Sequence, residues 1–143
     1  MKTTLLPLLV LAACLMTGCK PSGSESGGSG RKKIVFVSNG VAAFWTIAAS
    51  GVKDEGPKFG VDTETLMPVE GISDQKRIIE DLLTKGVDGI SVSPIDPANQ
   101  NDILNTAAAR TKLITNDSDA PASNRLLYIG MDNYKAGRLC GEL

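Results

Sequence analysis

The chain has 143 residues, a length that suits one domain of ordinary size. Its 15 basic and 16 acidic residues give a net charge of −1 without a basic stripe, so the composition offers no electrostatic basis for binding nucleic acid. The absence of histidine removes the commonest general base and metal ligand, and the three cysteines have no second cluster to complete a zinc site. These absences favour a protein that is not an enzyme and that needs no metal or cofactor.

The N-terminal segment has the layout of a secretory signal. Lys2 supplies a short basic start, an apolar run follows from Leu5 to Met16, and small residues come next. The run contains Pro7 and is well short of the ~20 residues that a membrane-spanning helix requires. We predict that residues 1–18 are a signal peptide rather than a transmembrane anchor.

The end of this signal resembles the lipobox of bacterial lipoproteins, in which an apolar residue and two small residues precede a lipidated cysteine. "LAAC" at 11–14 is the closer literal match, but cleavage before Cys14 would leave a very short apolar region. We therefore predict lipidation at Cys19, the end of "MTGC", and keep Cys14 as the alternative. Together with the Gly/Ser-rich stretch that follows, Cys19 would form a flexible tether over residues 19–31. An ordinary disordered leader is the other interpretation.

From residue 32 onward, short apolar runs alternate with segments of helical periodicity. Pro57 should end the first helix, Ser73 or Asp74 can cap the second, and Gly86 stands where the second ends. Strands that alternate with helices imply right-handed crossovers, and so an α/β fold with a doubly wound parallel sheet. The predicted strands cover residues 32–39, 61–68, 87–94, 111–116 and 125–130, and the predicted helices cover 44–60, 73–86, 97–110 and 132–143. The first helix is indicated by Phe44, Ile47, Ala48 and Val52.

Sheets of this kind bind ligands at the carboxyl ends of their strands, and we call the loops that leave those ends the carboxyl edge. Aromatic faces stack on the C–H faces of sugar rings, while carboxylates and amides form hydrogen bonds with hydroxyls, so these loops suit a sugar. They carry little positive charge for an anion, and neither a G-x-G-x-x-G turn nor a phosphate-binding P-loop occurs. The loops hold Asn39, Phe44, Trp45, Glu70, Asp96, Asn116, Asp117, Asp119 and Asp132.

Five of these residues are predicted to bind the ligand. Phe44 and Trp45 are candidates for stacking, and Asn39, Asp96 and Asp117 are candidates for hydrogen bonding. Packing a helix onto the sheet is the alternative role for an aromatic residue. Since adjacent helical residues point about 100° apart, one of the pair can pack inward while the other faces the ligand. Capping or turn formation is the alternative for the two aspartates.

Several separated motifs together resemble the periplasmic sugar-binding proteins of the ribose-binding type. They are "KIVFVSNGVAAFWTIAASGVKDEG", "DQKRIIEDLLTKGVDGISVSPIDP", "LITNDSDAP" and "YIGMDNYKAGRLCGEL", and they run in order from Lys33 to the end. The resemblance implies a lobe of the type I periplasmic binding fold, one of two lobes that close on a monosaccharide. It also implies delivery of that sugar to an ABC permease, from the periplasm or cell envelope of a bacterium, by a protein held to a membrane by its lipid.

The resemblance extends to individual site residues. In the family, aromatics just after the first strand stack on the sugar, and Phe44 and Trp45 stand at those positions. The loop after the fourth strand supplies an Asp, here Asp117, and usually an Arg, where this chain has Ser118. Ala42 stands where an Asn is often found. These departures leave the general mode of binding intact but imply that the hydroxyl pattern is recognised differently from that of ribose.

The family also has a second lobe of similar size, which we predict to be missing. Residues 32–130 would form the N-terminal sugar-binding lobe, and residues 131–143 would be the start of a truncated second lobe. Half of a two-lobed clamp cannot enclose its ligand, so we expect a reduced affinity.

Three other functions are open to this fold. A ligand-sensing receptor coupled to a chemoreceptor or sensor kinase is the main alternative. A repressor would require an N-terminal helix-turn-helix, whereas residues 1–31 have the composition of a signal and linker. A glycoside hydrolase would require a pair of carboxylates such as Asp96 and Asp117, but no histidine or nucleophile motif supports it.

Overall fold

The computed structural model describes residues 30–143, so the predicted signal peptide, Cys14, Cys19 and nearly all of the tether lie outside the described residues. The described chain is built on a five-stranded sheet with strand order β2-β1-β3-β4-β5, in which every pairing is parallel. This confirms the predicted α/β class and its parallel sheet. The strands are β1 (Lys33–Val37), β2 (Asp62–Leu66), β3 (Gly89–Val92), β4 (Lys112–Asn116) and β5 (Tyr128–Ile129).

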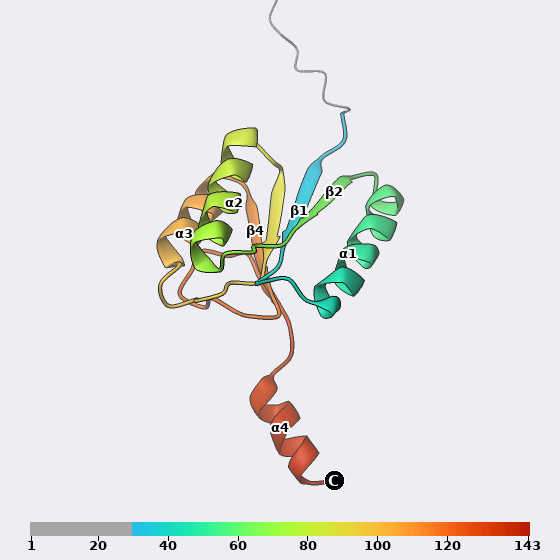
Figure 1. Ribbon diagram of the computed structural model, residues 1–143, viewed down its shortest axis with the longest axis vertical. Coiled ribbons are helices and arrows are strands. Elements are labelled where there is room, and N and C mark those ends of the chain that lie inside the picture. The colour runs from blue at the N-terminus through green and yellow to red at the C-terminus, as the bar shows by residue number, and fades with distance from the viewer. Residues whose placement is uncertain (1–29) are drawn as a thin grey trace, which may run out of the picture.

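Helices cover both faces of the sheet. In Figure 1, α2 and α3 lie on one side of the strands and α1 lies on the other, as expected of a doubly wound fold. Among the described residues, no helix is long and apolar enough to cross a membrane. The helices are α1 (Ala43–Glu55), the short 3₁₀ helix η1 (Gly56–Phe59), α2 (Ile72–Lys85), α3 (Asn101–Arg110) and α4 (Asn133–Gly141).

The main core lies between the sheet and the pair α2 and α3. Alternate strand residues point toward these helices, so Val35, Val37, Ile90 and Val92 are fully or almost fully buried. On the opposite face, residues such as Phe36 remain partly exposed beside α1. The burial of side chains on the two faces of the sheet fixes the strand register. Because all five strands are parallel, their carboxyl ends lie at one edge of the sheet.

The sequence prediction for α2 was right about its inward face and wrong about its start. Its buried positions recur at helical spacing, and Gly86 ends it with φ of 68°, a conformation that favours glycine. However, neither Ser73 nor Asp74 is the N-cap. The helix begins at Ile72 after Gly71, and the Asp74 carboxylate instead accepts a hydrogen bond from the Val69 backbone N–H.

The inward face of α1 agrees only in part with the apolar spacing, because Ala48 and Val52 are partly buried. Phe44 and Ile47 are exposed, with 62% and 75% of their surface accessible, whereas Trp45 is only 6% exposed. The helix is therefore rotated so that Trp45 packs on the sheet beside Phe36, with ring centroids 5.7 Å apart. As predicted, α1 ends at the Gly56–Pro57 pair, where η1 begins.

The last helix stands away from the rest of the described chain. No residue of α4 is buried, and Figure 1 shows it beyond the carboxyl edge, connected through the segment that follows β5. Asp132 caps it by accepting a hydrogen bond from the Lys135 backbone N–H. Cys140, on this helix, is an exposed free thiol.

Candidate functional site

Three of the five predicted site residues form one hydrogen-bonded cluster at the carboxyl edge. The Trp45 indole Nε1 donates to Asn39 Oδ1 at 2.9 Å, and Asn39 Nδ2 donates to Asp117 Oδ2 at 3.4 Å. Asn39 follows β1 and Asp117 follows β4, so the fold unites positions 78 residues apart in the sequence. The cluster joins an aromatic side chain, an amide and a carboxylate, the groups that sugar recognition requires.

Asp117 is held by two further contacts that the sequence did not predict. The buried Ser93 hydroxyl donates to Asp117 Oδ2 at 3.1 Å, and the Tyr128 hydroxyl donates to the Asp117 backbone carbonyl at 2.8 Å. Asp117 is the only described non-glycine residue with a positive φ, 57°. Aspartate tolerates this left-handed conformation better than most residues, and here it turns an exposed carboxylate toward the loop that follows β1.

The two adjacent aromatics have different environments. Phe44 and Trp45 meet edge to face, with ring centroids 4.9 Å apart and an interplanar angle of 77°. Trp45 is buried, and its indole N–H is satisfied by Asn39. Phe44 presents most of its surface to solvent next to that cluster. One aromatic therefore anchors the start of α1, and the other is available to a ligand.

Asp96 lies at the same edge but is engaged locally. Its carboxylate accepts hydrogen bonds from the Asn99 side chain, at 2.7 Å, and from the Asn99 backbone N–H, at 3.3 Å. Its backbone N–H donates to Gln100 Oε1 at 2.8 Å. These bonds stabilise the turn before α3, which is the turn role that the sequence had left open for this residue.

An ion pair supports the loop that carries Asp117. Both guanidinium nitrogens Nε and Nη2 of Arg125 donate to the Asp119 carboxylate, which also accepts from the Thr115 hydroxyl at 2.8 Å. The hydrogen bond from Arg125 is the largest cause that holds the pKa of Asp119 below its ordinary value, and Thr115 adds to it. The other acidic edge residues are not part of the cluster around Asp117: Asp132 caps α4, and Glu70 accepts a bond from Ser73 through its carbonyl.

Two buried glutamines beneath the carboxyl edge were also missed by the sequence analysis. Gln75 lies on α2 and Gln100 precedes α3, and both side chains are almost inaccessible to solvent. Gln75 interrupts an apolar stripe that continues through Ile78, Ile79 and Leu82. A polar residue at a core position of an amphipathic helix was the signal that could have identified it, because buried polar groups need partners.

The described residues contain no group of three or more His, Cys, Asp or Glu side chains that could hold a metal ion. The residues at the carboxyl edge offer hydrogen-bonding groups and an exposed aromatic surface. This chemistry suits reversible binding of a neutral polar molecule.

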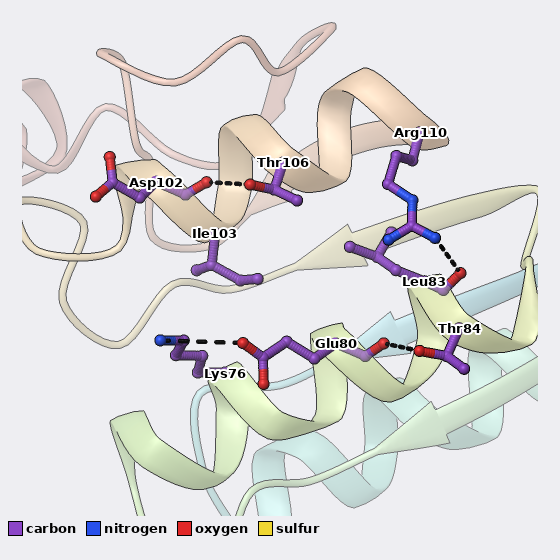
Figure 2. A pocket seen from close by; sticks show the side chains of 8 residues that line it. All are labelled: Lys76, Glu80, Leu83, Thr84, Asp102, Ile103, Thr106 and Arg110. Carbon is purple, nitrogen blue, oxygen red and sulfur yellow. Dashed lines mark hydrogen bonds and ion pairs between the residues drawn. The ribbon is translucent and has the colours of Figure 1, made fainter.

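A separate groove of about 330 Å³ lies between α2 and α3 (Figure 2). In Figure 2, the Thr84 and Thr106 hydroxyls bond to carbonyls of their own helices, and Arg110 donates to the Leu83 carbonyl. These side chains mainly bond within or between the two helices. The groove includes none of the five predicted site residues, so we regard it as a surface depression and place the site at the carboxyl edge.

Known proteins resemble this chain in sequence and in fold. Over 97% of its length it is 25% identical to the ribose import binding protein RbsB of Bacillus subtilis (strain 168), and the match covers 48% of that protein. An ABC transporter solute-binding protein from Burkholderia graminis C4D1M, solved in complex with D-arabinose, gives a TM-score of 0.75 at 30% identity, covering 80% of this chain and 41% of that one. A XylFII–LytSN complex gives a TM-score of 0.72 at 26% identity, covering 78% and 42%.

The chain thus spans less than half the length of these relatives. Residues 34–143 match the periplasmic binding protein domain family. That range contains all of the described sheet except its first residue, together with the cluster at the carboxyl edge. The family resemblance drawn from the sequence motifs is confirmed, and the chain belongs to the periplasmic binding protein domain family.

Proposed function

We propose that the chain is the N-terminal lobe of a substrate-binding lipoprotein of a sugar ABC importer. In this function the lobe binds a monosaccharide at its carboxyl edge, between itself and a second lobe, and the whole protein delivers the sugar to a permease. The observation that carries the proposal is the cluster of Asn39, Trp45 and Asp117 beside the exposed ring of Phe44.

The three cluster residues, Phe44 and Asp96 each have a part in the proposed binding. Phe44 stacks on the apolar face of the sugar ring, and Trp45 supports Phe44 and orients Asn39. The Asp117 carboxylate accepts hydrogen bonds from sugar hydroxyls, which are stronger because the acceptor is charged. Asn39 can donate to or accept from a neighbouring hydroxyl. Asp96, at the periphery of the site, accepts a further hydrogen bond from a sugar hydroxyl through carboxylate lone pairs that Asn99 does not use.

The names of the relatives support the sugar and the transport partner. Two of them are a ribose import binding protein and an ABC transporter protein in complex with D-arabinose. The extracytoplasmic location follows from the family, and attachment to a membrane through Cys19 rests on the sequence of the N-terminal segment alone.

Saturation-transfer NMR on the purified chain tests the proposal, because it detects the weak binding expected of a single lobe. We expect D-ribose, D-arabinose, D-glucose or D-galactose to receive saturation from the protein, and Phe44→Ala to reduce the transfer strongly. Lys76→Ala, in the groove between α2 and α3, is the matched control and should leave it unchanged. Transfer that depends on Lys76 and not on Phe44 would place the sugar in the groove and contradict the proposal.

A second candidate is a ligand-sensing receptor domain coupled to a chemoreceptor or sensor kinase. The observation that favours it is the likeness to a XylFII–LytSN complex, since a protein of this fold there assembles with another protein. Isolation of the protein from cells under cross-linking distinguishes the candidates: an importer component should be recovered with a permease, and a receptor with a signalling protein.

A further inference from the structure

The side chain of Gln75 uses all of its hydrogen-bonding capacity below the carboxyl edge. It is 0% exposed, and its Nε2 donates to two backbone carbonyls, Ser38 O and Ser93 O, each at 2.8 Å. Its Oε1 accepts from the Ile95 backbone N–H at 3.2 Å and from the side chain of Gln100 at 2.8 Å. Both N–H donors and both acceptor positions of the amide are therefore occupied.

Gln100 extends this arrangement to a further loop position. Its Nε2 donates to Gln75 Oε1, and its own Oε1 accepts from the Asp96 backbone N–H at 2.8 Å. Gln75 on α2 and Gln100 just before α3 thus form a buried pair, which we call the amide pair. The amide pair bonds to the backbone where the chain leaves β1 and where it leaves β3.

Both attachment points lead directly to the candidate sugar site. Ser38 is the residue before Asn39, so the hydrogen bond to Ser38 O fixes the backbone from which the Asn39 side chain starts. Ser93 donates through its hydroxyl to Asp117, so the hydrogen bond to Ser93 O fixes the donor that orients that carboxylate. The amide pair touches neither Asn39 nor Asp117, but it holds a neighbour of each.

We propose that Gln75 and Gln100 are positioning residues, which hold the loops after β1 and β3 in the geometry that brings Asn39 and Asp117 together for ligand binding. Packing alone would be served by an apolar residue on this face of α2, as at Ile78 and Ile79. An amide at this position instead satisfies two carbonyls that would otherwise be buried without partners. The proposal rests on the proposed function for the identity of the ligand, but not for the geometry.

Gln75→Met tests the inference, because methionine has a similar length and no hydrogen-bonding amide. We expect the Ile95 and Asp96 amides to exchange their hydrogens roughly tenfold faster relative to the core strands, as expected for the loss of about one buried hydrogen bond. The fluorescence of Trp45, the only tryptophan, should change, because its indole N–H loses a fixed Asn39 acceptor. Affinity for whichever test sugar binds the wild type should fall by a similar factor.

Ile79→Val is the matched control, since Ile79 is buried on the same helix and its aliphatic side chain cannot form hydrogen bonds. It should lower stability without changing the relative exchange at Ile95 and Asp96 or the Trp45 emission. If Gln75→Met fails to fold, Gln100→Met provides the same measurements with smaller expected changes. It removes the bond to the Asp96 N–H and one of the two bonds that Gln75 Oε1 accepts, and so loosens the amide that holds Ser38 and Ser93.

The outcomes separate the two proposals. If Gln75→Met, or Gln100→Met in its place, matches Ile79→Val in relative amide exchange and in Trp45 emission, the amide pair is a structural element only and the inference is wrong. If the wild type binds none of the four sugars while both readouts change as expected, the positioning role stands and the proposed sugar function fails.

Discussion

At the scale of single residues, Asp117 combines an unusual backbone conformation with hydrogen bonds from three other residues. Its left-handed backbone costs a non-glycine residue about 1 kcal/mol, a cost that the surrounding hydrogen bonds offset. Asn39 and Ser93 donate to its carboxylate, and Tyr128 donates to its carbonyl. These contacts give one orientation to a charged acceptor that would otherwise sample several, and so lower the entropy that ligand binding must overcome.

We predict that Phe44→Ala mainly lowers the affinity for sugar, whereas Trp45→Ala mainly lowers the stability of the fold. Phe44 is exposed, so its removal should weaken sugar binding about tenfold, as expected for lost stacking together with lost apolar contact. The free energy of unfolding should change little. Trp45 is buried, so its removal should lower the free energy of unfolding by about 3–5 kcal/mol. Urea titrations and calorimetry measure the two quantities, and equal losses of stability would contradict an exposed role for Phe44.

We predict that Asp117→Asn weakens binding at least about tenfold with the fold retained. Asparagine tolerates the left-handed conformation as well as aspartate does, so the backbone is not strained further. The change removes the charge that strengthens hydrogen bonds to sugar hydroxyls. Calorimetry should show the loss of affinity, and Asp54→Asn, at an exposed position of α1, should show none. An unchanged affinity in Asp117→Asn would mean that this carboxylate does not contact the ligand.

At the scale of elements, the segment between β4 and β5 carries Asp117 and depends on an ion pair rather than on regular structure. Asp119 and Arg125 lie six residues apart, and their bidentate contact closes this segment into a compact loop. The Thr115 hydroxyl, at the end of β4, ties the same carboxylate to the sheet. The loop is therefore attached to the strand that positions Asp117.

We predict that this loop loses stability in acid. The pKa of Asp119 is held below its ordinary value, chiefly by the hydrogen bond from Arg125, so the folded state binds this proton less readily than the unfolded state. The ion pair therefore contributes about 1 kcal/mol to the free energy of unfolding. This contribution is complete above the pKa of an unfolded aspartate, about 3.9, and is lost as the pH falls through the lower pKa of the folded state. As the pH is lowered below about 4, the urea concentration at the midpoint of unfolding should decrease more steeply for the wild type than for Asp119→Asn. Parallel pH profiles for the two proteins would show that the ion pair adds no pH-dependent stability.

At the scale of the whole molecule, burial is unevenly distributed over the described chain. The face of the sheet toward α2 and α3 is closed, whereas large apolar side chains remain exposed at the end of β5 and on α4, among them Ile129, Tyr134 and Leu139. Figure 1 shows α4 apart from the sheet, so it gains little stability from tertiary packing.

We predict that the amides of α4 exchange rapidly while those of β1 and β3 are protected. A nine-residue helix without buried residues is marginal by itself in water, whereas strands inside the sheet open only with larger unfolding events. Hydrogen exchange followed by mass spectrometry compares residues 133–141 with residues 33–37 and 89–92 in the monomer. Strong protection across α4 would show that another part of the protein covers it.

We predict that Cys19→Ala abolishes lipid labelling in cells and that Cys14→Ala does not. The prediction rests on the basic start, the apolar run and the small residues before Cys19, and it concerns a segment outside the described residues. Radiolabelled palmitate followed by electrophoresis makes the comparison. The reverse pattern would move the processing site to Cys14, and labelling of both variants would refute a single lipidated cysteine.

The sequence by itself determined the α/β class, the order of strands and helices and the set of loops that form the carboxyl edge. These features follow from hydrophobic periodicity and from the turn chemistry of residues such as Pro57 and Gly86, both of which are local properties of the chain. Asn39, the aromatic pair and Asp117 could be selected for the same reason, because the ends of parallel strands must meet at one edge.

Only the tertiary structure decided how those residues are used. Whether Phe44 or Trp45 faces solvent depends on the rotation of α1 against the sheet. The apolar spacing on α1 combined the partly buried Ala48 and Val52 with the exposed Phe44 and Ile47, so it could not decide this rotation. Likewise, the side-chain partners of Gln75 are 18 to 37 residues away along the chain, so the neighbouring sequence could not predict them. Long-range packing and hydrogen bonding satisfy a buried polar group, and a one-dimensional pattern can show that such a group needs partners without showing which ones it finds.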